Sequence, residues 1–267
     1  MKNFNAQKAK DLCVQWIRAW FESNGDGCNA VIGISGGKDS SVVAALCVEA
    51  LGKDRVFGVL MPDRTQMDIG DSYELVRHLE IDYAEINVGP AISGVYQGFI
   101  DNAIATPSEG SPFFQRTGVV LSDQAEINLP ARIRMATLYA VSQSVNGRVA
   151  NTCNLSENWI GYSTRWGDAV CDFAPIAHFT SEEVSEIGQA CGLPRELTHK
   201  TPADGLCGKT DEDNFGFSYE VLNRYILTQE CDDPAVKEKI DYLHNKNLFK
   251  LRPIPEFIPA AEDMLWS

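Results

Sequence analysis

The sequence has few basic residues for its length. Its 267 residues include 23 Lys and Arg against 37 Asp and Glu, which gives a formal net charge of −14. A surface of that sign repels nucleic acids and anionic membranes, so neither is expected as a main partner. A phosphate-rich ligand would need local basic groups or a metal ion to neutralise its charge.

Long hydrophobic runs and paired cysteines are also missing. No apolar run reaches the length of a membrane span, and the polar start MKNFNAQKAKDL lacks the apolar segment of a signal peptide. The eight cysteines are scattered without a Cys-x-x-Cys pair, so a zinc or redox site of that kind is not expected. We therefore expect a cytoplasmic chain whose cysteines are reduced.

The hydrophobic pattern predicts an α/β fold in one domain. No internal repeat or linker is visible, so a single domain is expected over 1–267, with its core at about 10–250 and an irregular tail at 249–267. Strands that alternate with helices imply a doubly wound, mostly parallel sheet. Strands are expected at 29–34, 55–61, 83–88 and 148–152, and helices at 5–23, 41–51, 70–80, 129–145, 181–191, 218–229 and 234–247. Residues 105–118 and 200–216 are predicted loops, and the second has the length and composition of a lid.

The segment from Val31 to Ser41 carries the strongest functional signal. An apolar strand leads into the turn Ser35-Gly36-Gly37-Lys38-Asp39-Ser40, and a helix follows. Such a turn lets backbone N–H groups and a helix N-terminus converge on an anion, and Gly36 and Gly37 permit positive φ and close approach. It is not the usual P-loop, because Ile32 stands five positions before Gly37 and Asp39 follows the lysine. A carboxylate there repels phosphate unless Mg²⁺ lies between them. A glycine-rich turn without a ligand is the alternative.

Three more segments bear polar residues in suggestive places. The segment 151–157 follows a predicted strand, and the carboxyl ends of parallel strands share one edge, so it should lie near the glycine-rich turn. Arg132 and Tyr139 fall on one face of the predicted helix 129–145, with Asn128 as its cap and Pro130 in its first turn. The loop 161–172 carries Arg165, Asp168 and Asp172.

Taken together, these motifs resemble those of the N-type ATP pyrophosphatases. The turn 35–40 resembles their SGGxDS loop, and Asn128-Leu129-Pro130-Ala131-Arg132-Ile133-Arg134-Met135 resembles the N-x-x-A-R-x-R-M helix of the NAD⁺ synthetase family. Segment 151–172 is similar to that family's T-x-x-x-x-E and Y-G-D-x-x-x-D block, and segment 204–219 to its second mobile loop and following helix. The resemblance covers about 10–250 in the family's order. It implies a Rossmann-like fold of the adenine nucleotide alpha hydrolase type.

The resemblance implies an ammonia-dependent ligase reaction. The carboxylate of nicotinic acid adenine dinucleotide (deamido-NAD⁺) would attack the α-phosphate of ATP, so that pyrophosphate leaves and an adenylate forms. Ammonia would then displace AMP and give NAD⁺. Family members that use glutamine have an additional amidohydrolase domain, whereas this chain begins about thirty residues before the turn, so ammonia is the expected nitrogen donor.

The resemblance also implies site residues. Catalysis is expected from Asp168, which would orient or deprotonate ammonium, and from Asp39 and Lys38 at the ATP phosphates. Mg²⁺ is the expected metal, held by Asp39 and Glu157. The expected ATP contacts are Gly33, Ile34, Ser35, Gly36, Gly37, Lys38, Asp39, Ser40, Gln66, Thr152 and Lys209, with Asp68 and Asp71 near the adenosine. The expected dinucleotide contacts are Arg132, Tyr139, Arg165, Asp168, Asp172 and Lys250.

Several of these residues have a structural interpretation that stays open. Glu157 could instead be a helix cap three residues after Asn154, although the role of metal ligand is favoured and one side chain could not easily do both. Thr152 could end a strand. Arg132 could form a surface ion pair, Tyr139 could pack in the core, and the loop acids could be merely solvated. The sequence also departs from the family pattern: Ser181 stands where many members have a basic residue, and Phe249-Lys250-Leu251 replaces a C-terminal H-K-R. Lys209 could supply the missing charge.

The resemblance also implies a homodimer with the dinucleotide at the interface, which the aromatic helix 5–23 would suit.

Other functions remain compatible with the turn alone. A subunit of GMP synthetase would bind a purine monophosphate instead, and a tRNA-modifying relative fits the acidic charge poorly. A non-catalytic nucleotide sensor would need the turn but neither Glu157 nor Asp168.

Overall fold

Four parallel strands lie at the centre of the computed structural model, which describes residues 4–66, 69–101, 105–108, 111–115, 121–199 and 210–256. The strands are β1 (Asn29–Gly33), β2 (Val56–Leu60), β3 (Asp82–Glu85) and β6 (Gly147–Val149), in the order β3-β2-β1-β6. All three pairings are parallel. An isolated parallel bridge between Ala150 and Phe173 extends the sheet beyond β6. The predicted parallel sheet is confirmed.

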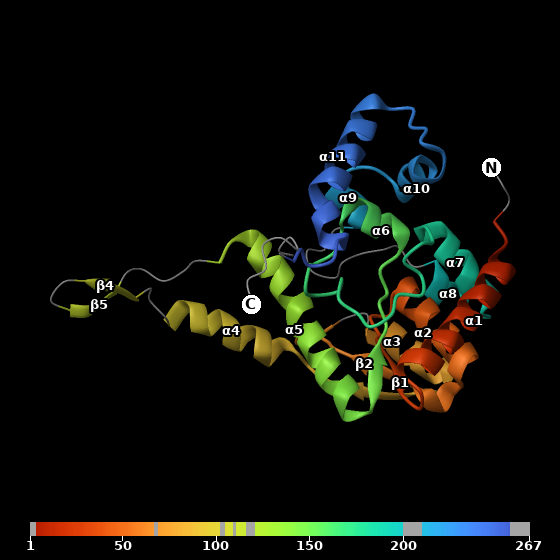
Figure 1. The fold of residues 1–267 in the computed structure, drawn as a ribbon, viewed down its shortest axis with the longest axis horizontal. Helices are drawn as coiled ribbons and strands as arrows, with labels where there is room; N and C mark the ends of the chain where they lie inside the picture. The colour runs from red at the N-terminus through yellow and green to blue at the C-terminus, as the bar shows by residue number, and fades with distance from the viewer. Residues whose placement is uncertain are drawn as a thin grey trace, which may run out of the picture.

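Side chains of β1 alternate between the two faces of the sheet, as the period of a strand requires. Ala30 and Ile32 join the larger core with α1 (Ala6–Asn24), α2 (Lys38–Leu51), α3 (Ile69–Leu79) and α7 (Ser181–Ala190). Val31 packs on the other face with Leu138 of α5 (Asp123–Ser144). Helices therefore cover both faces, which confirms the doubly wound fold (Figure 1).

A second core supports the carboxyl edge of the sheet. It joins α6 (Leu155–Ile160), α9 (Asp211–Phe215), α10 (Tyr219–Thr228) and α11 (Pro234–Leu251), which lie above the sheet in Figure 1. The short helix α8 (Arg195–Thr198) lies beside α7 and α2. The Ser156 hydroxyl donates to Asn223 Oδ1 at 2.6 Å and accepts from the Ser181 N–H at 3.0 Å. This buried network fixes α6 against α10 and α7.

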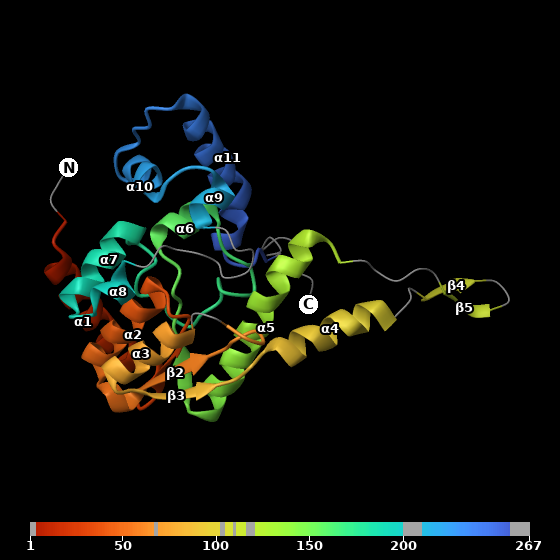
Figure 2. The ribbon, with the colours of Figure 1, turned by 180° about the vertical axis from the view of Figure 1, so that it is seen from behind.

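An arm projects from the body of the molecule. It contains α4 (Gly89–Asp101) and the antiparallel pair β4 (Ala105–Ser108) and β5 (Ser111–Gln115), and α5 returns from it to the sheet (Figures 1 and 2). The Tyr96 hydroxyl donates to the Glu126 carbonyl at 3.3 Å and joins α4 to α5. The sequence analysis missed α4, and its prediction of a loop over 105–118 was wrong where β4 and β5 pair.

Helix boundaries differ from the prediction in three places. Helix α5 begins at Asp123 with Ser122 as its cap, so Asn128 does not cap it and Pro130 lies inside it. Helix α2 begins at Lys38 rather than Ser41, because Gly37 is the extended cap residue. Helix α11 continues to Leu251, so the expected irregular tail begins later. The helix α9 likewise occupies the end of the predicted loop 200–216.

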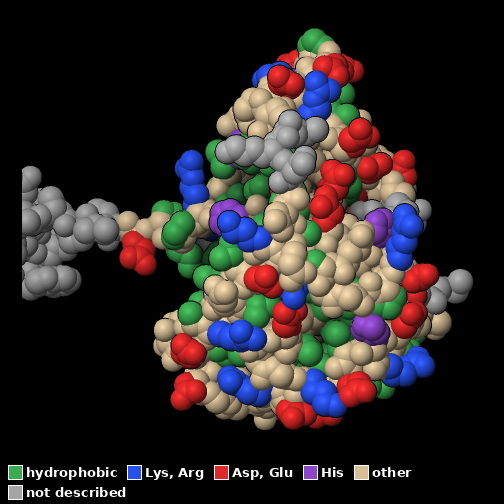
Figure 3. Space-filling model, turned by 90° about the vertical axis from the view of Figure 1, so that its right-hand side faces the viewer, with side chains coloured by type: hydrophobic (Ala, Val, Ile, Leu, Met, Phe, Trp, Pro, Cys, Tyr) green, Lys and Arg blue, Asp and Glu red, His purple; other side chains and the backbone are tan. Residues whose placement is uncertain are grey.

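The surface carries charges of both signs. Figure 3 shows acidic and basic side chains interspersed across one face of the molecule. In the described part of the chain, none of the helices combines the length and the apolar character needed to cross a membrane.

Candidate active site

The glycine-rich turn is held by its own hydroxyl groups. Ser35 Oγ lies 3.2 Å from Ser40 Oγ and accepts from the Gly37 N–H at 3.2 Å. Gly36 has φ +77°, and a Cβ there would lie 3.0 Å from Asp71 Cβ, so both positive φ and close approach apply to this glycine. Gly37 has an extended φ of −84° instead. The first N–H groups of α2 have no intrahelical partner and face an anion that enters this turn.

Lys38 lies in a buried cluster of opposite charges. Its side chain is 6% exposed, and Nζ donates to Asp39 Oδ2 at 2.8 Å. Burial alone would lower the pKa of the ammonium, but the charges of Asp39, Glu157 and Asp211 outweigh it and raise the pKa of Lys38. Nζ also lies 6.0 Å from the ring centre of Tyr219, whose hydroxyl donates to Asp211 Oδ2 at 3.0 Å. Lys38 is therefore charged and close to three carboxylates.

Glu157 caps α6 and also faces Asp39. Its Oε2 accepts from the Asn154 N–H at 3.0 Å, while Asn154 Oδ1 accepts from the Glu157 N–H at 3.1 Å. Burial, together with the Asp39 carboxylate, raises the pKa of Glu157 well above its ordinary range. The structure thus confirms the capping interpretation. It also brings together the two carboxylates that were predicted to hold a metal.

Cys153 joins this cluster to Asp168. The thiol is buried, and Sγ lies 3.6 Å from the Asp168 carbonyl oxygen. Burial raises the pKa of this thiol, and the charges of Asp168, Glu157 and Asp39 raise it further. Asn151 Nδ2 donates to the same carbonyl at 2.8 Å. The turn and the loop 161–172 therefore border one residue and form a single site.

The last helix holds the loop that carries Asp168. Lys250 of α11 donates to the carbonyls of Gly161 at 2.7 Å and Ser163 at 2.9 Å. Asp168 Oδ1 accepts from the Thr164 N–H at 2.7 Å. Asp168 itself is exposed to solvent, and burial lowers the pKa of Lys250. A weakly basic ligand that enters here would meet an accessible carboxylate, which can accept its proton.

Arg165 lies between two aromatic rings at the rim of the site. Its guanidinium lies 4.8 Å from the ring centre of Trp166 and 5.3 Å from that of Phe249. Both rings are about half exposed. The Arg165 carbonyl accepts from Arg132 Nε at 3.4 Å, which ties the loop to α5. Sequence reasoning named both arginines, noted Phe249 only as a departure from the family pattern, and did not name Trp166.

Asp172 and Tyr139 contribute to the fold at the edge of the site. Asp172 Oδ2 accepts from the Val149 N–H at 2.7 Å, and Oδ1 accepts from the Tyr139 hydroxyl at 3.2 Å. Tyr139 is half-buried against the second sheet face, and burial raises the pKa of its hydroxyl. The structure brings the two predicted contacts together and shows each engaged with the protein.

The other predicted contacts follow the carboxyl ends of strands. Gly33 ends β1, and buried Ile34 follows it and donates its N–H to the Val59 carbonyl. Half-buried Thr152 follows β6, and half-buried Gln66 lies between β2 and α3. Lys209 and Asp68 lie outside the described residues.

Sequence reasoning missed Asp211 and Tyr219 as neighbours of the site and treated Asn154 only as a cap. The contact of Asn154 Nδ2 with Asp39 Oδ1, at 3.1 Å, spans 115 positions of the chain. Nothing local in the sequence indicates it. Asn128, expected as a cap, accepts from the Thr164 hydroxyl at 2.8 Å and so steadies the Asp168 loop.

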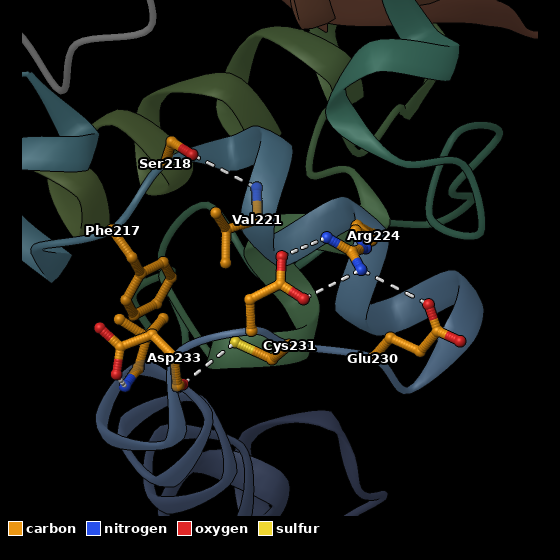
Figure 4. Close-up of a pocket in the computed structure, with 9 residues that line it drawn as sticks. Phe217, Ser218, Val221, Arg224, Glu230, Cys231 and Asp233 are labelled. Carbon is orange, nitrogen blue, oxygen red and sulfur yellow. Dashed lines mark hydrogen bonds and ion pairs between the residues drawn. The ribbon is translucent and has the colours of Figure 1, made fainter.

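A pocket of about 260 Å³ lies away from this site, between α10 and the start of α11 (Figure 4). On its wall Arg224 is paired with Asp232 at 2.7 Å and with Glu230 at 3.5 Å. None of the predicted site residues lines it. It does not take part in the arrangement described above.

The carboxylate pair suits magnesium. Mg²⁺ binds oxygen ligands and usually takes one or two protein carboxylates together with waters and substrate phosphates. Asp39 and Glu157 supply two such carboxylates beside the anion-binding turn. Within the described ranges, no cluster of three or more His, Cys, Asp and Glu side chains is arranged for a metal. The donor set therefore fits Mg²⁺ shared with a phosphate ligand.

Comparison with known proteins gives one consistent family. The family model for NAD synthase matches residues 10–254. The NH(3)-dependent NAD(+) synthetase of Pyrococcus furiosus is 35% identical over 241 residues, which is 90% of this chain and 84% of that protein. The structure of NMN synthetase from Francisella tularensis superposes with a TM-score of 0.81 at 27% identity, over 96% of this chain and all of that one. The NH3-dependent NAD synthetase of Campylobacter jejuni gives 0.72 and 26% at the same coverage.

The first prediction concerns the stability of the metal-free protein. When folding raises the pKa of a carboxyl, its protonated form contributes to the free energy of unfolding. The contribution is complete below the pKa of the unfolded chain, about 4.3 for Glu, and it is lost as the pH rises through the pKa of the folded protein. Glu157→Gln keeps the capping box but cannot ionise. In EDTA at pH 8 we expect it to be more stable than wild type by about 0.5–2 kcal/mol, with the difference vanishing towards pH 4. Urea denaturation across pH 4–8 measures this.

Glu183→Gln is the matched control for that variant. Glu183 holds the same position in the capping box of α7, which begins at Thr180. The stability of the Glu183→Gln variant relative to wild type should not rise between pH 4 and pH 8 as that of Glu157→Gln does. A Glu157→Gln difference that stayed constant between pH 4 and pH 8 would contradict the assigned cause.

Proposed function

Because the chain belongs to the NAD synthase family, we propose that it converts deamido-NAD⁺ to NAD⁺ with ATP and ammonia, releasing AMP and pyrophosphate. The main support is the meeting of two groups at Cys153. The anion-binding turn with Asp39 and Glu157 lies on one side, and Asp168 lies on the other. One half suits activation of a carboxylate by ATP, and the other suits delivery of ammonia.

In the first step, an oxygen of the substrate carboxylate attacks the α-phosphorus of ATP. The bond to the bridging oxygen breaks, and pyrophosphate leaves with its electrons. The N–H groups at the start of α2 and the hydroxyls of Ser35 and Ser40 would bind the phosphates. The Lys38 ammonium, which donates to Asp39 in this structure, would also attract the negative charge of the leaving pyrophosphate.

Magnesium would be held by Asp39 and Glu157 together with phosphate oxygens. When bound, it supplies positive charge that neutralises the departing pyrophosphate. The same charge would relieve the repulsion between the two carboxylates, which burial makes unfavourable in its absence.

In the second step, ammonia attacks the acyl carbon of the adenylate, and AMP leaves with the former carboxylate oxygen. Asp168 would attract ammonium and accept its proton, because a carboxylate does both. Lys250 and Thr164 would keep its loop in position. Arg132, Arg165, Tyr139 and Asp172 would line the dinucleotide side.

The reaction would take place in the cytoplasm. The cysteines of the described residues are free, in keeping with a reducing compartment. The acidic surface fits small-molecule substrates rather than nucleic acid or a membrane as partners.

A second candidate substrate is the corresponding mononucleotide. The solved NMN synthetase superposes with a TM-score of 0.81, higher than the 0.72 of the NAD synthetase from Campylobacter jejuni. Phe249, one of the residues that depart from the family pattern, lies against Arg165 on the proposed dinucleotide side. The side chains at this rim would therefore decide which of the two substrates binds, and the reaction with ATP would be the same for both.

A homodimer is the proposed assembly. The arm of α4, β4 and β5 stands away from the body and exposes Ile100 at 76%, while Ile127 at the start of α5 is 47% exposed. Apolar side chains that stay exposed on such an arm add no stability to an isolated chain. A second copy of the chain would bury these side chains in a self-complementary contact.

The assay that tests the activity supplies ATP, Mg²⁺ and ammonium with one acyl substrate at a time. With deamido-NAD⁺ we expect one AMP and one pyrophosphate for each NAD⁺, and no turnover with XMP. Faster turnover of nicotinic acid mononucleotide would assign the second candidate. Glutamine in place of ammonium should give no product, and activity on XMP alone would refute the proposal.

The second test separates the two chemical steps. Asp168→Asn removes the base but keeps the oxygen that accepts from the Thr164 N–H. We expect kcat/KM for ammonium to fall about 10²- to 10⁴-fold, while the rate of pyrophosphate release without ammonium changes little. Equal losses in both steps would show that Asp168 acts on the fold or on ATP instead. Asp232→Asn, on the distant pocket, is the control.

The assembly is tested by a single charge placed on α5 beside the arm. Ile127→Asp should shift the solution mass measured by light scattering from two chains to one. Leu227→Asp places the same charge on an equally exposed position of α10, where 55% of the residue is accessible, and should leave the mass unchanged. A wild type that is monomeric at micromolar concentration would refute the dimer.

A further inference from the structure

Asn154 contacts both carboxylates of the site, Asp39 through its side-chain amide and Glu157 through its backbone N–H. It is fully buried. Its Nδ2 donates to Asp39 Oδ1 at 3.1 Å, its Oδ1 accepts from the Glu157 N–H at 3.1 Å, and its own N–H donates to Glu157 Oε2 at 3.0 Å. Every polar group of this residue except its carbonyl thus points at Asp39 or Glu157.

The orientation of the amide follows from its partners. A backbone N–H can only donate, so the Glu157 N–H must face the oxygen of the Asn154 side chain. The nitrogen then faces Asp39, whose carboxylate accepts. The reverse orientation would set two donors against each other at α6 and two acceptors against each other at Asp39.

The other capping boxes of the described chain show what this residue adds. Thr180 and Thr210 cap α7 and α9, and each hydroxyl bonds within its own box. At α6 the cap residue is an asparagine instead, with a second group left to reach across to α2. The cap alone does not require it, because Ser, Thr and Asp cap helices about as well.

We propose that Asn154 is a positioning residue that sets the separation and orientation of Asp39 and Glu157 towards a shared Mg²⁺. The side-chain amide of Asn154 donates to Asp39 Oδ1, and its Oδ1 accepts from the Glu157 N–H, which fixes the start of α6 relative to Asp39. The backbone N–H of Asn154 then orients the Glu157 carboxylate through Oε2, while Lys38 Nζ holds Asp39 Oδ2. The inference rests on the proposed function, since it assumes that the pair holds the metal of the ATP complex.

The test measures metal binding rather than turnover. Asn154→Ser keeps a good helix cap but cannot reach Asp39. The ligand is α,β-methylene-ATP, an analogue that cannot be cleaved at its α-phosphate. Calorimetry measures its binding at a series of Mg²⁺ concentrations. We expect the apparent Mg²⁺ dissociation constant of Asn154→Ser to rise about 10- to 100-fold, as for other residues that orient metal ligands.

Thr180→Ala is the matched control, because it weakens a buried capping box that does not touch Asp39. It should lower the thermal midpoint and leave the Mg²⁺ dependence as in wild type. An Asn154→Ser variant that binds Mg²⁺ and the analogue as tightly as wild type would overturn the inference. Asn154→Thr serves the same purpose if the serine variant does not fold.

A second measurement keeps the inference separate from the proposed function. If wild type binds the analogue equally well with and without Mg²⁺, the assignment of a shared metal to Asp39 and Glu157 is overturned, whereas the proposed function fails only if no NAD⁺ forms in the turnover assay. The contact itself is then tested in EDTA by a double-mutant cycle of Asn154→Ser and Asp39→Asn, followed by urea denaturation. Non-additive changes are expected because the two residues act through one contact, and additive changes would overturn the positioning role.

Discussion

The charge balance around Lys38 is the interaction on which the site depends. A buried ammonium is costly unless carboxylates surround it, and buried carboxylates are costly unless cations do. Here Lys38 faces Asp39, Glu157 and Asp211, which come from α2, α6 and α9. With three acids against this lysine, the group carries an excess of negative charge in a dry environment. Such a site would be stabilised by a ligand that brings positive charge, such as a divalent cation between the carboxylates.

The order of the strands explains why these three helices meet. β1 lies between β2 and β6, and each strand ends at the same edge of the sheet because all are parallel. The chain leaves β1 into the glycine-rich turn and leaves β6 into Asn151–Asn154 and then α6. Two segments more than a hundred positions apart thus become neighbours at the carboxyl edge, where ligands of doubly wound sheets bind. The buried Ser156 network then fixes α6 against α10, which carries Tyr219.

Local signals in the sequence predicted the elements well and the contacts between them less well. Gly36 at positive φ, the capping box at Thr180 and the alternation of strands and helices all depend on residues within a few positions, and all were found. The burial of Lys38 and the bond from Asn154 to Asp39 depend on which strands are neighbours, which no short pattern states. Helix α5 was placed too late for a related reason. Pro130 suggested a first turn, whereas a helix whose packing stabilises it can contain a proline.

The site has two halves. The strands of the sheet position one half, and a loop held by helix α11 forms the other. The phosphate side is built from the ends of β1 and β6 and includes the buried residues Lys38, Ser40 and Asn154, so a change at these positions disturbs the core as well. The opposite side is a loop held by Lys250 of the last helix and bordered by Arg165, Trp166 and Phe249, all of which reach the surface. Side chains on that side contact solvent, so substitutions there remove fewer buried contacts than substitutions of the buried residues on the phosphate side. The rim can therefore change its shape and charge without disturbing the sheet that positions the glycine-rich turn.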